Sequence, residues 1–354
     1  MCACHFGYSS PSLVFLSLRM SSFVSSCWRS LDALVSPRSS SLASSFTFDP
    51  SSTFLASPVY PVSFVSLYLV IILVLRLVIG GPVTGKKVRL YGLDTLHSTI
   101  LCVWSAMMVV GVVRASLARL DETAPSREAA HKHVRALSSF DPTNGWLAAN
   151  ADLFCFPPSV QAKGPLFFVS YSYYISKLYE LIDTVILVVK RKPLTFLHVG
   201  HHACVVLMSY LWLTERQSLQ AIALATNATI HVFMYFYYAA TSLGGVFAKL
   251  AVPFKVFITK GQIVQFVFSF VASIPFVVWT FADVGNVAAP SDEPRRLLSA
   301  LLYPGSLIRA SVGGGSACRG FDAWLFNAAF NAALLVLFVN FHKRTYGGKK
   351  EKKQ

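Results

Sequence analysis

Charged side chains are scarce in this sequence. Asp, Glu, Lys and Arg make up only 13% of its 354 residues, whereas 54% are hydrophobic. So little charge cannot cover the surface of an ordinary soluble domain, which excludes that class. The seven cysteines are scattered without a CxxC pair, which argues against a zinc-binding module.

Long apolar segments account for the low charge. A membrane-spanning helix needs about 20 mostly apolar residues, and seven segments meet this requirement. We therefore expect an all-α integral membrane protein with seven transmembrane helices. The expected helices cover residues 61–80, 95–115, 165–189, 195–214, 218–240, 255–282 and 321–342.

The basic residues indicate how the chain is oriented. The formal net charge is +15, and the basic clusters fall on one side of the membrane if the seven helices alternate in direction. The positive-inside rule makes this side the cytosol. The N-terminus is then lumenal and the C-terminus cytosolic, and the charge belongs to the membrane surface rather than to a nucleic-acid interface. The clusters are 85–89, 190–192, Lys249 with Lys255, and 342–354.

Three parts of the chain follow from these patterns. Residues 1–58 are rich in Ser and lack a helical or strand pattern, and a membrane domain is expected at 59–342. We expect the first segment to be disordered; its composition also resembles a transit peptide, and a true start at Met20 is a further alternative. Residues 343–354 form a basic tail, in which Lys350 and Lys352 resemble a dilysine retrieval signal of the endoplasmic reticulum. Cys155 and Cys318 both fall in loops expected to face the oxidising lumen, where they form either a disulfide or two separate thiols.

Four of the expected helices carry polar side chains at one depth. Their distances from the cytosolic ends of these helices, at 1.5 Å per residue, place the polar groups roughly 8–15 Å below the membrane surface. Ionisable groups inside a span mark a functional site by default. The segment "FLHVGHH" sets its three histidines at i, i+3 and i+4, on one helix face. The members of this layer are Glu180, Asp183, His198, His201, His202, Asn227, His231, Gln262 and Gln265.

Several chemistries fit this polar layer. Interhelical hydrogen bonds alone explain single amides, with about 0.6–2 kcal/mol each. Metal-dependent membrane oxidases also use histidine boxes, but the remaining histidines form no second box, and a single zinc site stays open. Imidazole can instead accept an acyl group from a thioester, or act as a base near neutral pH. A non-catalytic seven-span transporter or receptor is a further alternative.

Four ordered motifs resemble the very-long-chain fatty acid elongase (ELO) family. They are "KLYELIDT" (177–184), "FLHVGHH" (196–202), "NATIHVFMYFYY" (227–238) and "TKGQIVQ" (259–265). The resemblance implies an endoplasmic-reticulum enzyme that condenses acyl-CoA with malonyl-CoA to a 3-ketoacyl-CoA, releasing carbon dioxide and CoA. It implies seven helices, six of which enclose a tunnel for the acyl chain. It also implies no metal or redox cofactor, other elongation-cycle enzymes in the same membrane, and a homodimer as in other members.

The resemblance also implies residue roles. His201 would take the acyl group, and His231 would face it as base or proton carrier. Gly200 replaces a residue that is often aromatic in the family, and we expect it to leave room near the imidazoles. His198 and His202 would position the carbonyl groups, supported by Lys177, Glu180, Asp183, Asn227, Tyr235, Gln262 and Gln265. The candidates for binding the CoA phosphates are Lys190, Arg191, Lys192 and Lys255.

Overall fold

The elements that the structure describes are helices, joined by turns and loops. The computed structural model describes residues 29–81, 90, 92–123, 150–157, 159–281 and 318–346. Five helices within these ranges are long and apolar enough to cross a membrane. This confirms the all-helical membrane class. The five are α3 (Val59–Ile79), α4 (Leu93–Thr123), α10 (Phe196–Thr214), α13 (Phe254–Phe281) and α16 (Phe321–Tyr346).

Two further expected spans differ from simple apolar helices. The segment expected at 165–189 is divided at Leu181 into α8 (Pro165–Glu180) and α9 (Ile182–Val189). Helix α11 (Gln220–Leu243) is 24 residues long, but polar side chains lower its hydropathy. The count of seven spans therefore stays a prediction. The remaining described elements are short: α2 (Ser41–Ser44), η2 (Ala151–Leu153) and α12 (Gly245–Ala251).

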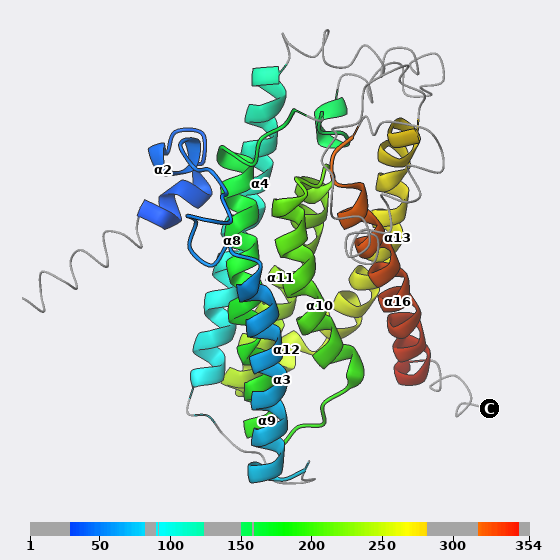
Figure 1. The fold of residues 1–354 in the computed structure, drawn as a ribbon. Coiled ribbons are helices and arrows are strands. Elements are labelled where there is room, and N and C mark those ends of the chain that lie inside the picture. Colours follow the sequence, from blue (N-terminus) through cyan, green and yellow to red (C-terminus); the bar gives the residue numbers. More distant parts are fainter. Residues whose placement is uncertain are drawn as a thin grey trace, which may run out of the picture.

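Six helices pack side by side to form a ring (Figure 1). Helix α4 contacts α8, α8 contacts α10, α10 contacts α16, α16 contacts α13, and α13 contacts α11, which returns to α4. Helix α3 lies outside this ring against α9 and α10. Its outward side chains are exposed, including Leu77 at 75% and Val78 at 78%. Such an apolar exterior is what lipid, rather than water, favours.

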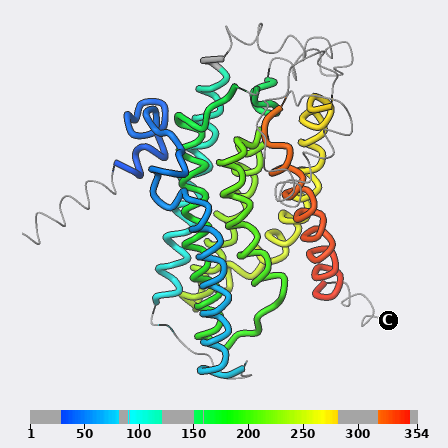
Figure 2. Tube along the Cα trace, in the orientation of Figure 1, coloured from blue at the N-terminus to red at the C-terminus, as the bar shows by residue number. Residues whose placement is uncertain are grey.

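Part of the N-terminal segment is folded against this bundle, which differs from the expected disorder. Ala33, Leu34 and Phe48 are buried in the main hydrophobic core. The carbonyl oxygen of Leu34 approaches Gly111 of α4 so closely that a Cβ atom there would lie 2.2 Å from it. Glycine is therefore required at this crossing. Residues 29–57 are included in the described chain, whereas 1–28 lie outside it, and Figure 2 shows the segment beside α4 and α8.

A disulfide joins the segments that precede α8 and α16. Cys155 and Cys318 are bonded to each other, and both are buried. Of the two alternatives given for these cysteines, the disulfide is therefore confirmed. The turn between α10 and α11 is hydrogen-bonded to the residues beside this disulfide. The Ser218 hydroxyl donates to the Arg319 carbonyl at 2.7 Å and accepts from the Phe156 amide at 2.9 Å. These contacts close the end of the bundle opposite to α9.

Candidate active site

One large cavity lies inside the ring of helices. Its volume is about 820 Å³, and α4, α8, α9, α10, α11, α13 and α16 all contribute lining side chains. Ligand pockets of enzymes have volumes of about 300–1,000 Å³. The predicted residues that line the cavity are His198, His201, His202, His231, Asp183, Asn227, Gln262, Gln265, Lys190, Lys192 and Lys255. The predicted residues Lys177, Glu180, Tyr235 and Arg191 do not line it.

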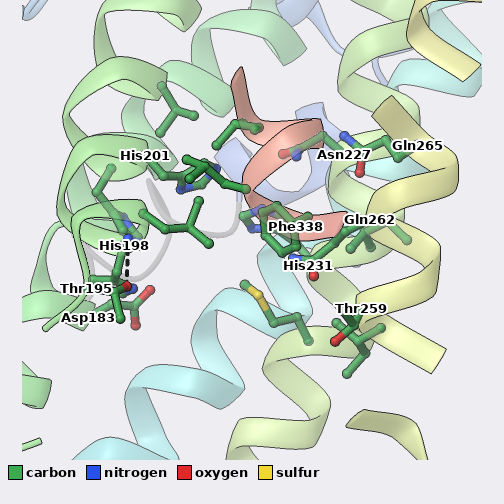
Figure 3. Close-up of a pocket in the computed structure, with 18 of the residues that line it drawn as sticks. Asp183, Thr195, His198, His201, Asn227, His231, Thr259, Gln262, Gln265 and Phe338 are labelled. Atoms are coloured by element: carbon green, nitrogen blue, oxygen red, sulfur yellow. Dashed lines mark hydrogen bonds between the residues drawn. The ribbon is translucent and has the colours of Figure 1, made fainter. Parts of the chain in front are cut away.

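The three histidines of the box begin α10. Thr195 caps this helix, because its hydroxyl oxygen accepts a hydrogen bond from the His198 amide at 3.2 Å. The ring centroids of His198 and His202 are 4.4 Å apart, and those of His201 and His202 are 5.3 Å apart. The spacing of i, i+3 and i+4 therefore brings the three rings together, as the sequence predicts. Figure 3 shows His198 and His201 on one side of the pocket.

His231 approaches the site from α11. Figure 3 shows it with Gln262 and Gln265 of α13, across the pocket from the box. Its side chain is 7% exposed, so it faces the interior of the bundle rather than lipid. The ring lies 5.5 Å from the Tyr235 ring, one helical turn away on the same helix. The predicted polar groups of α9, α10, α11 and α13 thus line one cavity, and their common depth in a membrane stays a prediction.

A buried ion pair lies behind His231. The Lys177 ammonium donates to Glu180 Oε1 at 2.7 Å, and their side chains are 2% and 0% exposed. The Nδ1 atom of His231 is 3.5 Å from both Lys177 Nζ and Glu180 Oε1. The ammonium also lies 4.4 Å from the centre of the Tyr173 ring. This pair fixes the ring of His231 from the side away from the cavity.

The break at Leu181 places two adjacent polar residues at a junction of four helices. Asp183 Oδ2 accepts from the Tyr235 hydroxyl of α11 at 2.6 Å, and Asp183 Oδ1 lies 2.8 Å from His97 Nε2 of α4. The Thr184 hydroxyl lies 2.9 Å from His198 Nε2 of α10. The same hydroxyl lies 2.9 Å from the Tyr68 hydroxyl of α3. Sequence reasoning assigned no role to His97, Tyr68 or Thr184.

Basic side chains line the cavity at the end near α9. Lys190, Lys192 and Lys255 were expected there, and Arg344 near the end of α16 joins them. Lys190 is not free, because its ammonium contacts the Asp94 carboxylate of α4. Lys192 uses its carbonyl oxygen to accept from Arg76 of α3. The last four lysines of the tail lie outside the described residues, whereas Lys343 belongs to α16; the four are Lys349, Lys350, Lys352 and Lys353.

Toward Trp212, away from the basic side chains, the cavity is lined by aromatic and aliphatic side chains. Trp212 and Met208 of α10 line it, and Tyr173 stacks on Trp212 at 5.3 Å with an interplanar angle of 8°. The Tyr173 hydroxyl donates to Asn227 Oδ1 at 2.8 Å, which fixes this amide. Gly200 does not line the cavity, and a Cβ there would meet the Phe196 ring of the same helix at 3.7 Å. The prediction that Gly200 leaves room beside the imidazoles is therefore wrong.

Within the described residues, no group of three or more His, Cys, Asp or Glu side chains is arranged to hold a metal ion. The donors are instead engaged with one another: His198 with Thr184, and His97 and Tyr235 with Asp183. These hydrogen bonds fix the side chains of His198 and Asp183 at the cavity.

The fold and cavity define a multi-pass helical membrane protein with a polar, histidine-lined interior site. The family model described as the GNS1/SUR4 family (ELO) matches residues 53–354. The chain belongs to this family. Its expected resemblance to the elongases is thereby confirmed.

Three relatives illustrate the similarity. Fatty acid elongase sre1 of Dictyostelium discoideum is 32% identical over 222 residues, which cover 62% of this chain and 70% of the relative. Fatty acid elongase 6 of Leishmania major is 40% identical over 112 residues, or 30% of this chain and 29% of the relative. Another D. discoideum protein, whose name also contains "fatty acid elongase", is 36% identical over 205 residues. That match spans 58% of each chain, so the chain covers less than two thirds of this relative's length.

Proposed function

We propose that this protein is the condensing enzyme of fatty acid elongation, a 3-ketoacyl-CoA synthase. It joins acyl-CoA and malonyl-CoA and releases carbon dioxide and CoA. Membership of the elongase family supports this reaction class. The observation that carries the chemistry is that the histidine box and His231 line one interior cavity, with a buried ammonium–carboxylate pair behind His231.

The first half-reaction is an acyl transfer to His201. A ring nitrogen of neutral His201 attacks the thioester carbonyl, the carbon–sulfur bond breaks, and the acyl-imidazole forms as the CoA thiolate leaves. His202, whose ring packs beside His201, holds the attacking ring, and His198, whose ring packs beside His202, holds the carbonyl oxygen. His231 carries the proton between the imidazole and the departing sulfur. Its Nδ1 is already engaged by Lys177 and Glu180, so its Nε2 is the atom that exchanges the proton.

The second half-reaction forms the carbon–carbon bond. Malonyl-CoA loses carbon dioxide, and the electron pair of the broken bond forms an enolate. The enolate carbon attacks the acyl carbon, the carbon–nitrogen bond breaks, and His201 is regenerated. Over the whole cycle one proton is consumed and ends on CoA. Gln262, Gln265 and Asn227 are amides that line the cavity and donate to the enolate or carboxylate oxygens. Loss of carbon dioxide drives the reaction, so no metal or redox cofactor is needed.

The cavity has two ends suited to the two parts of an acyl-CoA. Lys192, Lys255 and Arg344 at the basic end suit the CoA phosphates. The apolar end near Trp212 suits the acyl chain, and we propose that the ring of six helices encloses a tunnel for this chain within a seven-span bundle. The basic end then faces the cytosol and the disulfide faces the lumen of the endoplasmic reticulum. The other enzymes of the elongation cycle, in the same membrane, take up the product, and a homodimer is the expected assembly.

The test is made in microsomes that contain the chain. We expect labelled malonyl-CoA and a fatty acyl-CoA to give a product two carbons longer, and His201→Ala to abolish it at an unchanged protein level. His342→Ala is the matched control, because His342 of α16 does not line the cavity. Product formation by His201→Ala would remove this residue as the nucleophile. Loss of wild-type activity with a chelator would favour a metal-dependent oxidase, and the absence of product would favour a transporter or receptor.

A further inference from the structure

His97 is a buried polar residue that none of the four motifs contains. It lies near the start of α4, is 5% exposed and lines the cavity. Its nearest polar partner is 86 residues away in sequence, since His97 Nε2 lies 2.8 Å from Asp183 Oδ1. Burial of an imidazole in an apolar helix costs free energy unless the ring is hydrogen-bonded, so a buried histidine there indicates a structural or functional role.

The geometry defines which ring nitrogen of His97 carries the proton. A carboxylate only accepts hydrogen bonds, so the contact requires the tautomer with hydrogen on Nε2. The Nδ1 atom is buried and has no hydrogen-bond partner in the described chain. The ring packs against Tyr179 at 5.0 Å. Because neither nitrogen is open to the cavity, His97 is arranged to hold another group rather than to react itself.

The group that it holds is Asp183. The second oxygen of this carboxylate accepts from the Tyr235 hydroxyl at 2.6 Å, and Tyr235 packs against His231. Both carboxylate oxygens are therefore engaged, by residues of the two neighbouring helices α4 and α11. A chain of contacts runs from His97 through Asp183 and Tyr235 to His231.

We propose that His97 is a positioning residue of this site, which fixes Asp183 so that Tyr235, bound to Asp183, holds the ring of His231 at the cavity. The inference rests on the proposed function for its kinetic consequence, but not for its structural one. Sequence reasoning confined to the four motifs omits His97, because its role depends on a contact between distant helices.

The kinetic test compares two substitutions at His97. His97→Phe keeps a ring against Tyr179 but removes the donor, and we expect kcat to fall about 10- to 100-fold, the range for residues that orient an active group. The KM for acyl-CoA should change little, because neither ring nitrogen of His97 is open to the cavity. His97→Gln carries an amide donor near the position of Nε2 and should recover most of the loss. His342→Phe is the matched control and should leave kcat unchanged.

The structural test does not depend on activity. Thermal unfolding in detergent is measured for His97→Phe, Tyr235→Phe and the double variant, in the wild-type and Asp183→Leu backgrounds. Because both residues bind one carboxylate, their effects should be non-additive, and this coupling should vanish without Asp183. Additive effects, a wild-type kcat for His97→Phe, or equal loss in His97→Gln would each overturn the proposal. If wild-type protein makes no product, the proposed function fails, whereas the unfolding cycle still decides the role of His97.

Discussion

Replacing Glu180 with Gln leaves the Lys177 ammonium buried without its counter-ion. The two groups are 2.7 Å apart, and their side chains are 2% and 0% exposed, so water cannot replace the lost carboxylate. Breaking such a pair by removing one partner typically costs about 3–5 kcal/mol. We therefore expect Glu180→Gln to lower the free energy of unfolding by that amount, which is a factor of about 10² to 10⁴ in the folding equilibrium.

The double variant Lys177→Met with Glu180→Leu separates stability from activity. Replacing a whole buried ion pair by apolar side chains is often neutral, or stabilises by about 1–4 kcal/mol. The double variant should thus regain most of the stability that Glu180→Gln loses. It should stay inactive, because His231 Nδ1 has lost both neighbours that lie at 3.5 Å.

The assay is equilibrium unfolding in mixed detergent micelles, followed by tryptophan fluorescence, with elongation measured on the same preparations. Lys249→Met is the matched control, since Lys249 is exposed on α12. It should change the free energy of unfolding by less than about 1 kcal/mol, as exposed charges do. A cost below about 1 kcal/mol for Glu180→Gln would refute the reasoning, because it is the size expected of an exposed pair.

Two further perturbations test other contacts. Thr184→Val preserves the shape of the side chain but removes the hydroxyl shared by the first box histidine and Tyr68; we expect lower kcat with normal expression, and unchanged kinetics would contradict this. Changing Cys155 and Cys318 to Ser removes a link across 163 residues and should lower the free energy of unfolding by about 2–4 kcal/mol. In the wild type, alkylation of both cysteines only after reduction should appear by mass spectrometry.

Local helix geometry made part of the site predictable. His198, His201 and His202 share a face because residues three and four positions apart are neighbours on any helix. Distance along each helix from its basic end also placed Asn227 and His231 at the level of the box. These inferences need only the rise per residue and antiparallel packing, so they hold without knowledge of which helices touch.

Other features depend on contacts that no single helix determines. The pairing of Lys190 with Asp94 and of His97 with Asp183 needs α4 beside α9, which the sequence does not specify. Because residues 29–57 are rich in Ser, the burial of the few apolar side chains there could not be predicted from the sequence. Gly111 is the one local signal of that crossing, because a glycine inside an apolar helix often marks close approach of another backbone.

The first motif (177–184) ends in Asp183 and Thr184, two adjacent residues with different structural roles. Successive residues of a helix point about 100° apart, so two adjacent side chains serve two directions. Asp183 is directed to α4 and α11, where both partners are donors and a two-oxygen acceptor is needed. Thr184 is directed to α10 and α3, where an imidazole nitrogen and a phenol meet one hydroxyl that can both donate and accept. The two residues are therefore not interchangeable, and the break at Leu181 brings this pair to the junction at which the four helices position the site.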